Sequence, residues 1–440
     1  MSKMPEMINR REFPKRRKEL MRMMGEGSIA ILPTASEKVR NSDADYTFRA
    51  DSDFYYLTGF PEPEALMVLV PGRANGEFVL FCRERDPEKE IWHGRRAGLE
   101  GACEKYGADD AFPITDIDDI LPGLIEKCDK VFHTFGNDMG YDQLITRMVH
   151  KLRNQSRSGA HYPHEFVSLE HLLHDMRLYK SRSELKVMRE AAEVSVAAHI
   201  RAMQVCRPGM MEYQLEAEFL YAFRRHNGHA AYTTIVGGGE NGCILHYTEN
   251  NCPLQDGDLV LIDAGGEIDN YAADITRTFP VNGRFSEAQR AVYQVVLDAQ
   301  YAAIEQVKPG NHWNDPHEAA VKVLTKGLVK LGLLKGRLPK LIKDQAYRRF
   351  YMHRTGHWIG MDVHDVGDYK VGDEWRVLEP GMVLTIEPGL YIGAEEDIPI
   401  EFRNIGVRIE DDVVVTKDGH EILTEGAPKE ISEIEKLMVG

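Results

Sequence analysis

The stretch Gly257–Pro280, GDLVLIDAGGEIDNYAADITRTFP, decides the fold predicted for the second half of this chain. Two runs within it, 258–264 and 271–279, are rich in Val, Ile, Leu, Thr and aromatic residues. They flank a cluster of Gly, Asp and Asn, and this combination is typical of a β-hairpin. The sequence therefore predicts two paired strands joined by a tight turn.

Each predicted strand of this hairpin carries an aspartate. Asp263 and Asp274 are equidistant from the Ile268–Asp269 peptide, so we expect them to face each other with Cβ atoms roughly 5 Å apart. Two aspartates that face each other in isolation would more often be solvated side chains on an exposed strand. If the pair is half-buried, mutual repulsion calls for a divalent metal between the carboxylates or a proton on one of them.

A second copy of the first strand favours the metal. At an offset of 124 residues (381 − 257), Gly257–Gly265 matches Gly381–Gly389, and both copies contain a glycine, an apolar strand, a carboxylate and a small turn. Such an internal repeat indicates a duplicated α/β unit. We expect the copies to pack about a pseudo-twofold axis, which would bring Asp263 and Glu387 together at the centre.

The second copy also has a partner strand, which contains Glu410. The Ile398–Pro399 peptide lies midway between Glu387 and Glu410, so these carboxylates should also pair across strands. Four carboxylates from two hairpins then meet in one pocket. Their repulsion in a partly dry pocket costs on the order of several kcal/mol for each uncompensated charge, so we expect cations among them.

Three histidines follow in the segment HRTGHWIGMDVH, at His353, His357 and His364. Its two glycines argue for a loop and strand near a site and against a helical zinc motif. Singly, each histidine would more often be an ordinary core or surface group. One imidazole with carboxylate oxygens favours Mn²⁺, with Co²⁺, Fe²⁺ or Zn²⁺ as alternatives. Two ions about 3.5 Å apart would share a bridging hydroxide, so the predicted reaction class is hydrolysis.

The composition excludes some classes of protein. The chain has 440 residues, with 54 basic and 70 acidic side chains and a formal net charge of −16, which argues against a general binder of nucleic acid or anionic membranes. Six cysteines without a CxxC pair fit a reduced cytoplasm. Neither a signal peptide nor an apolar run of about 18 residues is seen. We therefore expect a cytoplasmic protein.

The pattern of elements predicts two domains of α/β (α+β) class. Short apolar runs alternate with helical segments up to Arg177, and a capping box at Ser181–Glu184 then opens a long helix to about Val205. Further helices are predicted from Ser286 to Val307 and over Asp315–Leu331. We expect domains at 1–177 and 178–440. Within the first, EIWHGRR at 90–96 is predicted to be a loop, and an ordinary surface turn is its simplest interpretation.

A set of four carboxylates and one histidine, with its flanking motifs, resembles the five metal ligands of the pita-bread metallopeptidases, a family that includes methionine aminopeptidase, prolidase and aminopeptidase P. The set is Asp263, Asp274, His357, Glu387 and Glu410. Segments 239–250 (GENGCILHYTEN), 357–367 (HWIGMDVHDVG) and 378–392 (LEPGMVLTIEPGLYI) are most similar to bacterial aminopeptidase P. The resemblance implies a creatinase/prolidase-type α/β domain followed by a pita-bread domain with duplicated α/β halves. Methionine aminopeptidases lack the first domain, which counts against that branch.

The resemblance also implies roles for individual residues. The metal ligands would be Asp263 on one ion, Asp274 and Glu410 bridging both, and His357 and Glu387 on the second. Glu387 would also accept a proton from the bridging water, and the other catalytic residues would be His364 as proton shuttle, His246 steadying the scissile peptide, and Arg408. The proline side of the pocket would comprise His353, Tyr391 and Arg408, and the N-terminal side chain would meet Tyr232 and Leu245.

The implied substrate is a peptide with proline in the second position. A peptide bond before proline lacks an N–H and resists general proteases, and its nitrogen needs a general acid on leaving. In such enzymes a neighbouring subunit of a tetramer helps close the active site, and Trp92 would do so here in a homotetramer or dimer. Trp375 lies in KVGDEWR (370–376), where only a polar loop is expected.

Three alternative functions are known for proteins with this fold or this type of site. A prolidase would have the same site but cleave only dipeptides. A phosphotriesterase-like activity would be a promiscuous use of that site. A metal-free binding protein on the same fold would require the loss of ligands, whereas all five are present here.

Overall fold

The computed structural model describes residues 7–439, which form two compact units. The N-terminal unit comprises Asn9–His174, and the C-terminal unit comprises the chain from Asp175 onwards with Met7 and Ile8. The chain passes from one unit to the other within the helix α7, Glu170–Leu178. None of the helices within residues 7–439 combines the length and the apolar character that crossing a bilayer requires.

The N-terminal unit is built on a mixed six-stranded sheet in the order β6-β5-β4-β1-β7-β8. Its strands are β1 Ser28–Pro33, β4 Leu66–Leu69, β5 Phe78–Cys82, β6 Asp110–Pro113, β7 Lys130–His133 and β8 Glu165–Ser168, and a small separate hairpin is formed by β2 Val39–Asn41 and β3 Ala44–Asp45. Its helices are α1 Glu12–Met24, α2 Ser52–Thr58, α3 Pro87–His93, α4 Gly98–Tyr106, α5 Ile117–Ile125 and α6 Met139–Asn154. Apolar side chains of the sheet pack on α5 and α6 in one buried cluster.

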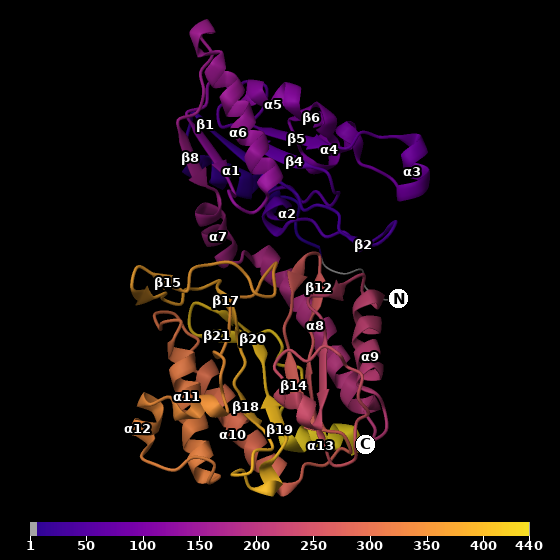
Figure 1. The fold of residues 1–440 in the computed structure, drawn as a ribbon, viewed down its shortest axis with the longest axis vertical. Helices are drawn as coiled ribbons and strands as arrows, with labels where there is room; N and C mark the ends of the chain where they lie inside the picture. The colour runs from indigo at the N-terminus through magenta and orange to yellow at the C-terminus, as the bar shows by residue number, and fades with distance from the viewer. Residues whose placement is uncertain (1–6, 440) are drawn as a thin grey trace. The chain divides into compact units, whose positions relative to one another are not determined.

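Two pairs of helices flank the strands of the C-terminal unit (Figure 1). Helix α8, Arg182–Val205, packs on α9, Glu212–Arg225, and α10, Glu287–Ile304, packs on α11, Asp315–Lys330. The predicted capping boxes are present at the starts of α8 and α10. In each, the side chain of the N-cap serine accepts the backbone N–H of the residue three positions later, and the side chain of that residue accepts the N–H of the serine. Two shorter helices are α12 Leu338–Lys343 and α13 Ile431–Val439.

The strands of this unit form several small antiparallel sheets. The sheets that carry the predicted ligands are β10-β11-β14, β13-β12-β9, β17-β20-β21 and β18-β19, and β15-β16 is a separate ribbon. The strands are β9 His229–Ala230, β10 Ile235–Gly238, β11 Leu259–Asp263, β12 Gly266–Ile268, β13 Tyr271–Ala272, β14 Thr276–Pro280, β15 Lys370–Val371, β16 Glu374–Trp375, β17 Val383–Ile386, β18 Gly389–Ile392, β19 Ile405–Arg408, β20 Asp411–Val415 and β21 His420–Ile422. One apolar core joins these sheets to both helix pairs.

The register of the first hairpin differs from the prediction. Asp263 is paired with Thr276, and Ile268 is paired with Tyr271, so the prediction that Asp263 lies directly opposite Asp274 was wrong. The turn is centred one residue later than expected, on Asp269 and Asn270, whose φ angles of 47° and 62° suit a two-residue hairpin turn. Because the resulting shift of two residues preserves the side-chain alternation, Asp274 remains on the face of Asp263 as a diagonal neighbour.

The second hairpin has the predicted register. Ile386 is paired with Asp411 and Gly389 with Arg408, so continuing the pairing from either side places Glu387 opposite Glu410. Both strands are interrupted at this point, between β17 and β18 and between β19 and β20. The two glutamates therefore lie where the ladder is open.

Candidate metal centre

Three of the five predicted metal ligands form a compact cluster. Asp274, His357 and Glu410 each offer one donor atom, and these three atoms lie within 4.8 Å of one another. Nε2 of His357 is 3.4 Å from Oδ2 of Asp274 and 3.9 Å from Oε1 of Glu387. Asp263 joins the cluster through a buried tyrosine described below. All five side chains line one cavity of about 460 Å³.

Breaks in the strands and one irregular segment present these ligands. Asp263 ends β11, Asp274 lies between β13 and β14, and the two glutamates lie at the interruptions of the second hairpin. His357 belongs to a segment without regular structure, and its backbone is fixed to Thr385, which accepts and donates one hydrogen bond each. Gly356 permits this approach, because a Cβ there would lie 2.0 Å from the carbonyl oxygen of Thr385.

The cluster is electrostatically unbalanced in the absence of cations. Burial, followed by repulsion from Asp274 and Glu387, raises the pKa of Glu410 well above its usual range. Burial also raises the pKa of Asp263, and it raises the pKa of Glu387 to about 7. For His357, burial alone would lower the pKa, but the hydrogen bond and charge of Asp274 raise it to about 9.

This donor set fits divalent cations. Carboxylates that cannot all be ionised together are stabilised by a positive charge placed among them. Nδ1 of His357 lies 2.9 Å from the carbonyl oxygen of Trp358, which leaves Nε2 facing the carboxylates, as in the histidines that bind metals through Nε2. Oxygen donors with one imidazole nitrogen and no thiolate fit a hard or borderline ion.

Tyr232 joins two of the ligands. Its hydroxyl lies 2.6 Å from Oδ1 of Asp263 and 2.5 Å from Oδ1 of Asp274. Burial and the two carboxylates raise its pKa well above the ordinary value, so the hydroxyl remains a donor. We had expected Tyr232 only beside the N-terminal side chain of the substrate, and its contact with two ligands is an additional feature.

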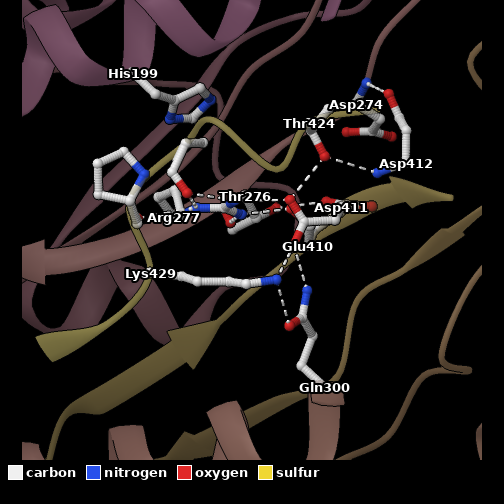
Figure 2. A network of polar contacts seen from close by, with 12 residues as sticks. His199, Asp274, Thr276, Arg277, Gln300, Glu410, Asp411, Asp412, Thr424 and Lys429 are labelled. Carbon is white, nitrogen blue, oxygen red and sulfur yellow. Dashed lines mark hydrogen bonds and ion pairs between the residues drawn. The ribbon is translucent and has the colours of Figure 1, made fainter. Parts of the chain in front are cut away.

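A buried polar network contacts the backbone of Glu410 (Figure 2). Arg277 donates from Nη1 to the carbonyl oxygen of Glu410 and from Nη2 to Oδ1 of Asp411, at 2.6 and 2.7 Å. Lys429 and Gln300 donate to Oδ2 of Asp411 at 2.7 and 2.5 Å. Burial alone would raise the pKa of Asp411, but the two cations lower it to about 2. Arg277 and Asp411 are both fully buried.

Asp412, which follows Asp411 in β20, holds the backbone of Asp274. Oδ2 of Asp412 accepts the backbone N–H of Asp274 at 3.0 Å, and Thr276 Oγ1 donates to Oε2 of Glu410 at 2.6 Å. Burial and repulsion from Asp274 raise the pKa of Asp412 well above its usual range. The sequence pattern did not indicate a role for Arg277, Asp411 or Asp412, although each is within three residues of a predicted ligand.

The residues expected on the proline side form a hydrogen-bonded chain. Arg408 donates to Oδ2 of Asp263 at 2.6 Å and to the hydroxyl of Tyr391 at 2.9 Å, and that hydroxyl lies 2.8 Å from Nε2 of His353. Burial, followed by the charge of Arg408, lowers the pKa of His353 to about 3, so this imidazole is neutral. His353 and Arg408 line the cavity, whereas Tyr391 is buried beneath them.

The other predicted site residues divide into two groups. His364, His246 and Leu245 line the cavity, and the ring of His364 lies edge-on to that of His357 at 4.4 Å. Burial lowers the pKa of His364. Trp92 belongs to the N-terminal unit and is 82% exposed. The prediction of a loop there was wrong, because Pro87–His93 form the short helix α3, capped by Asp86.

Comparisons with known proteins found relatives that match nearly the whole chain. The family model described as "Metallopeptidase family M24" matches residues 186–417, and that described as "Aminopeptidase P, N-terminal domain" matches residues 13–132. The chain is 48% identical to the Xaa-Pro aminopeptidase of Escherichia coli (strain K12), over 98% of each chain. Among solved structures, aminopeptidase PepP of Pseudomonas aeruginosa has a TM-score of 0.98 and 60% identity, with 98% of each chain covered. Zinc-substituted E. coli aminopeptidase P with product has a TM-score of 0.96 and 47% identity, with 99% of each covered.

Proposed function

The chain belongs to metallopeptidase family M24, and from this premise we propose that it is a Xaa-Pro aminopeptidase, which removes the first residue of peptides whose second residue is proline. The observation that carries the proposal is the convergence of Asp263, Asp274, His357, Glu387 and Glu410 on one cavity. The E. coli relative named above, which matches this chain over nearly its whole length, is a Xaa-Pro aminopeptidase.

Two divalent metal ions are the proposed cofactors, with Mn²⁺ favoured over Co²⁺, Zn²⁺ or Fe²⁺ by the hard donor set. The residues that would hold them are Asp263, Asp274, His357, Glu387 and Glu410. When bound, such ions make water nucleophilic near neutral pH and polarise the attacked carbonyl. The chain's part is to hold these side chains together around one cavity. The network of Arg277 and Asp411 supports this, because Arg277 donates to the backbone carbonyl oxygen of Glu410.

The remaining roles belong to side chains around the ligands. Glu387 is the proposed proton acceptor, and His364, beside His357, is the proposed group that carries a proton to the leaving proline nitrogen. His246 would steady the scissile peptide. On the proline side, hydrogen bonds that link Arg408, Tyr391 and His353 would hold the side chains that contact the proline ring. Tyr232 and Leu245 would border the N-terminal side chain.

Further parts of the proposal concern the whole protein. The catalytic domain would be residues 178–440, preceded by an aminopeptidase P domain at 1–177. The proposed assembly is a homotetramer or dimer in the cytoplasm, and the high exposure of Trp92 suits a contact with a neighbouring subunit.

A comparison of peptide lengths tests the proposed specificity. The metal-loaded enzyme should release the first residue from Xaa-Pro-Yaa-Zaa peptides and leave the matched Xaa-Ala-Yaa-Zaa peptides intact. Liquid chromatography with mass detection of the freed amino acid provides the measurement. Activity confined to Xaa-Pro dipeptides would indicate a prolidase and refute the proposal.

A further inference from the structure

The cavity has a cationic side chain that the proposed mechanism does not use. Arg354 lines the cavity directly after His353, whose Nδ1 lies 2.7 Å from the carbonyl oxygen of Arg354. The Arg354 side chain is exposed. Because His353 is proposed for the proline side, we expect Arg354 to border the path of the substrate residues that follow the proline.

Contacts with two elements hold the guanidinium of Arg354. Its Nη2 donates to Oδ1 of Asn314, the N-cap of α11, and its Cζ lies 4.7 Å from the ring centre of Trp375 in the β15-β16 ribbon. The amide of Asn314 is itself oriented, because its Nδ2 donates to Oε1 of Glu318 at 2.6 Å. The aromatic residue that was unexpected in a polar loop is therefore a platform for a cation.

Arg354 and Arg408 line the same cavity, but in the part of the chain that the structure describes only the charge of Arg408 is compensated by a carboxylate. Arg408 is buried and forms a 2.6 Å ion pair with Asp263. Within residues 7–439, the guanidinium of Arg354 has a neutral hydrogen-bond partner and no carboxylate at ion-pair distance. An oriented arginine with an unpaired charge, facing a cavity, is the group that best binds a carboxylate through two parallel hydrogen bonds.

We propose that Arg354, held by Asn314 and Trp375, is a specificity-determining residue that binds a substrate carboxylate beyond the proline. This inference rests on the proposed function and adds a preference within it. The carboxylate has two possible sources, namely the C-terminus of an Xaa-Pro-Yaa tripeptide and an acidic side chain in the third position of a longer peptide.

Two pairs of peptides separate these sources. The first pair is Ala-Pro-Ala with a free C-terminus and the same peptide as its C-terminal amide. The second is Ala-Pro-Glu-Ala-amide and Ala-Pro-Gln-Ala-amide, which differ by one charge in the third residue. We expect kcat/KM of the metal-loaded enzyme to be about tenfold higher for the anionic member of at least one pair. The difference should lie mainly in KM, because the contact is remote from the reacting bond.

Substitutions then assign the preference to Arg354. In Arg354→Gln the ratio of kcat/KM between anionic and neutral peptides should fall towards one, while Arg354→Lys should keep part of it, since charge remains but the planar fork is lost. Trp375→Leu should also lower the ratio. The matched control is Lys370→Gln, since Nζ of Lys370 lies over the same indole ring at 4.7 Å but does not line the cavity. This variant should keep the wild-type ratio.

The outcomes distinguish this inference from the proposed function. Equal cleavage of all four peptides by the wild type, or an unchanged ratio in Arg354→Gln, would overturn the subsite while leaving the aminopeptidase in place. Failure to cleave any of the four would overturn the proposed function. A ratio that falls equally in Lys370→Gln would show a general effect of charge at the rim and would refute the assignment to Arg354.

Discussion

The hydroxyl of Tyr232 lies within hydrogen-bond distance of two predicted ligands, the carboxylates of Asp263 and Asp274. Partners of metal ligands typically contribute about 10- to 100-fold to metal affinity or activity. We therefore expect Tyr232→Phe to weaken metal binding by about tenfold, as measured by activity against the free metal concentration. The matched control is Tyr391→Phe, whose hydroxyl contacts Arg408 and His353, and which should keep the metal affinity. An unchanged affinity in Tyr232→Phe would remove its proposed role.

His364 is the residue whose variant tests proton transfer. Its ring contacts that of His357 and lines the cavity. Because a group that acts in the transition state affects turnover more than substrate binding, His364→Ala should lower kcat by about 100-fold or more, with a much smaller change in KM. Steady-state kinetics on an Xaa-Pro-Yaa-Zaa peptide gives both constants. A near-normal kcat would show that another group delivers the proton.

At the scale of elements, the turn between β12 and β13 sets the register on which the ligands depend. Both turn residues have positive φ, and Asn270, at 62°, adopts a conformation that is unfavourable for β-branched residues. We expect Asn270→Val to lower the free energy of unfolding by about 1–2 kcal/mol. Asn270→Gly should leave it nearly unchanged, because glycine adopts this conformation without strain. Urea denaturation provides the measurement, and equal stabilities of the two variants would contradict the expectation.

A buried ion pair joins β14 to β20, next to the hydrogen bond from the backbone N–H of Glu410 to the carbonyl oxygen of Thr276. Arg277 and Asp411 are both fully buried, and removing one partner leaves the other charge without full compensation. Arg277→Met should therefore cost about 3–5 kcal/mol in the free energy of unfolding. The control is Arg290→Met, whose ion pair with Glu435 is partly exposed, and which should cost less than about 1 kcal/mol. Similar losses in both variants would show that burial does not decide the effect.

At the scale of the whole molecule, metal binding should be linked to folding. The ligands come from two hairpins and one irregular segment that are far apart in the sequence, so unfolding disperses them. Removing the metal with a chelator should abolish turnover and lower the melting temperature. Restoring Mn²⁺ at about 100 times its dissociation constant should stabilise the fold by about 2.7 kcal/mol. Calorimetry measures the change in melting temperature on adding the metal. The variant His357→Ala should be folded and inactive, and its melting temperature should change much less. An equal shift in that variant would place the stabilising metal elsewhere.

The sequence by itself determined the starts of long helices and the repeat of the two hairpins. The capping boxes at Ser181 and Ser286 fixed the starts of α8 and α10, because these depend on residues three positions apart. The repeat between Gly257 and Gly381 indicated the duplicated halves. Asp263 and Glu387 were predicted as ligands because a carboxylate recurs at the matching position of two apolar strands, and Asp274 and Glu410 because they lie on the partner strands. Such patterns are local, whereas His357 was singled out from three histidines by the family resemblance.

Only the tertiary structure decided how these parts meet. The register of the first hairpin followed from a turn one residue away from the predicted centre, which composition could not resolve. The contacts of Asp412 with Asp274, and of Arg354 with Trp375 and Asn314, join residues from separate segments. Packing brings such side chains together, and packing depends on the whole core. For that reason the sequence pattern predicted a set of metal ligands, while the fold determined which residues hold those side chains in place.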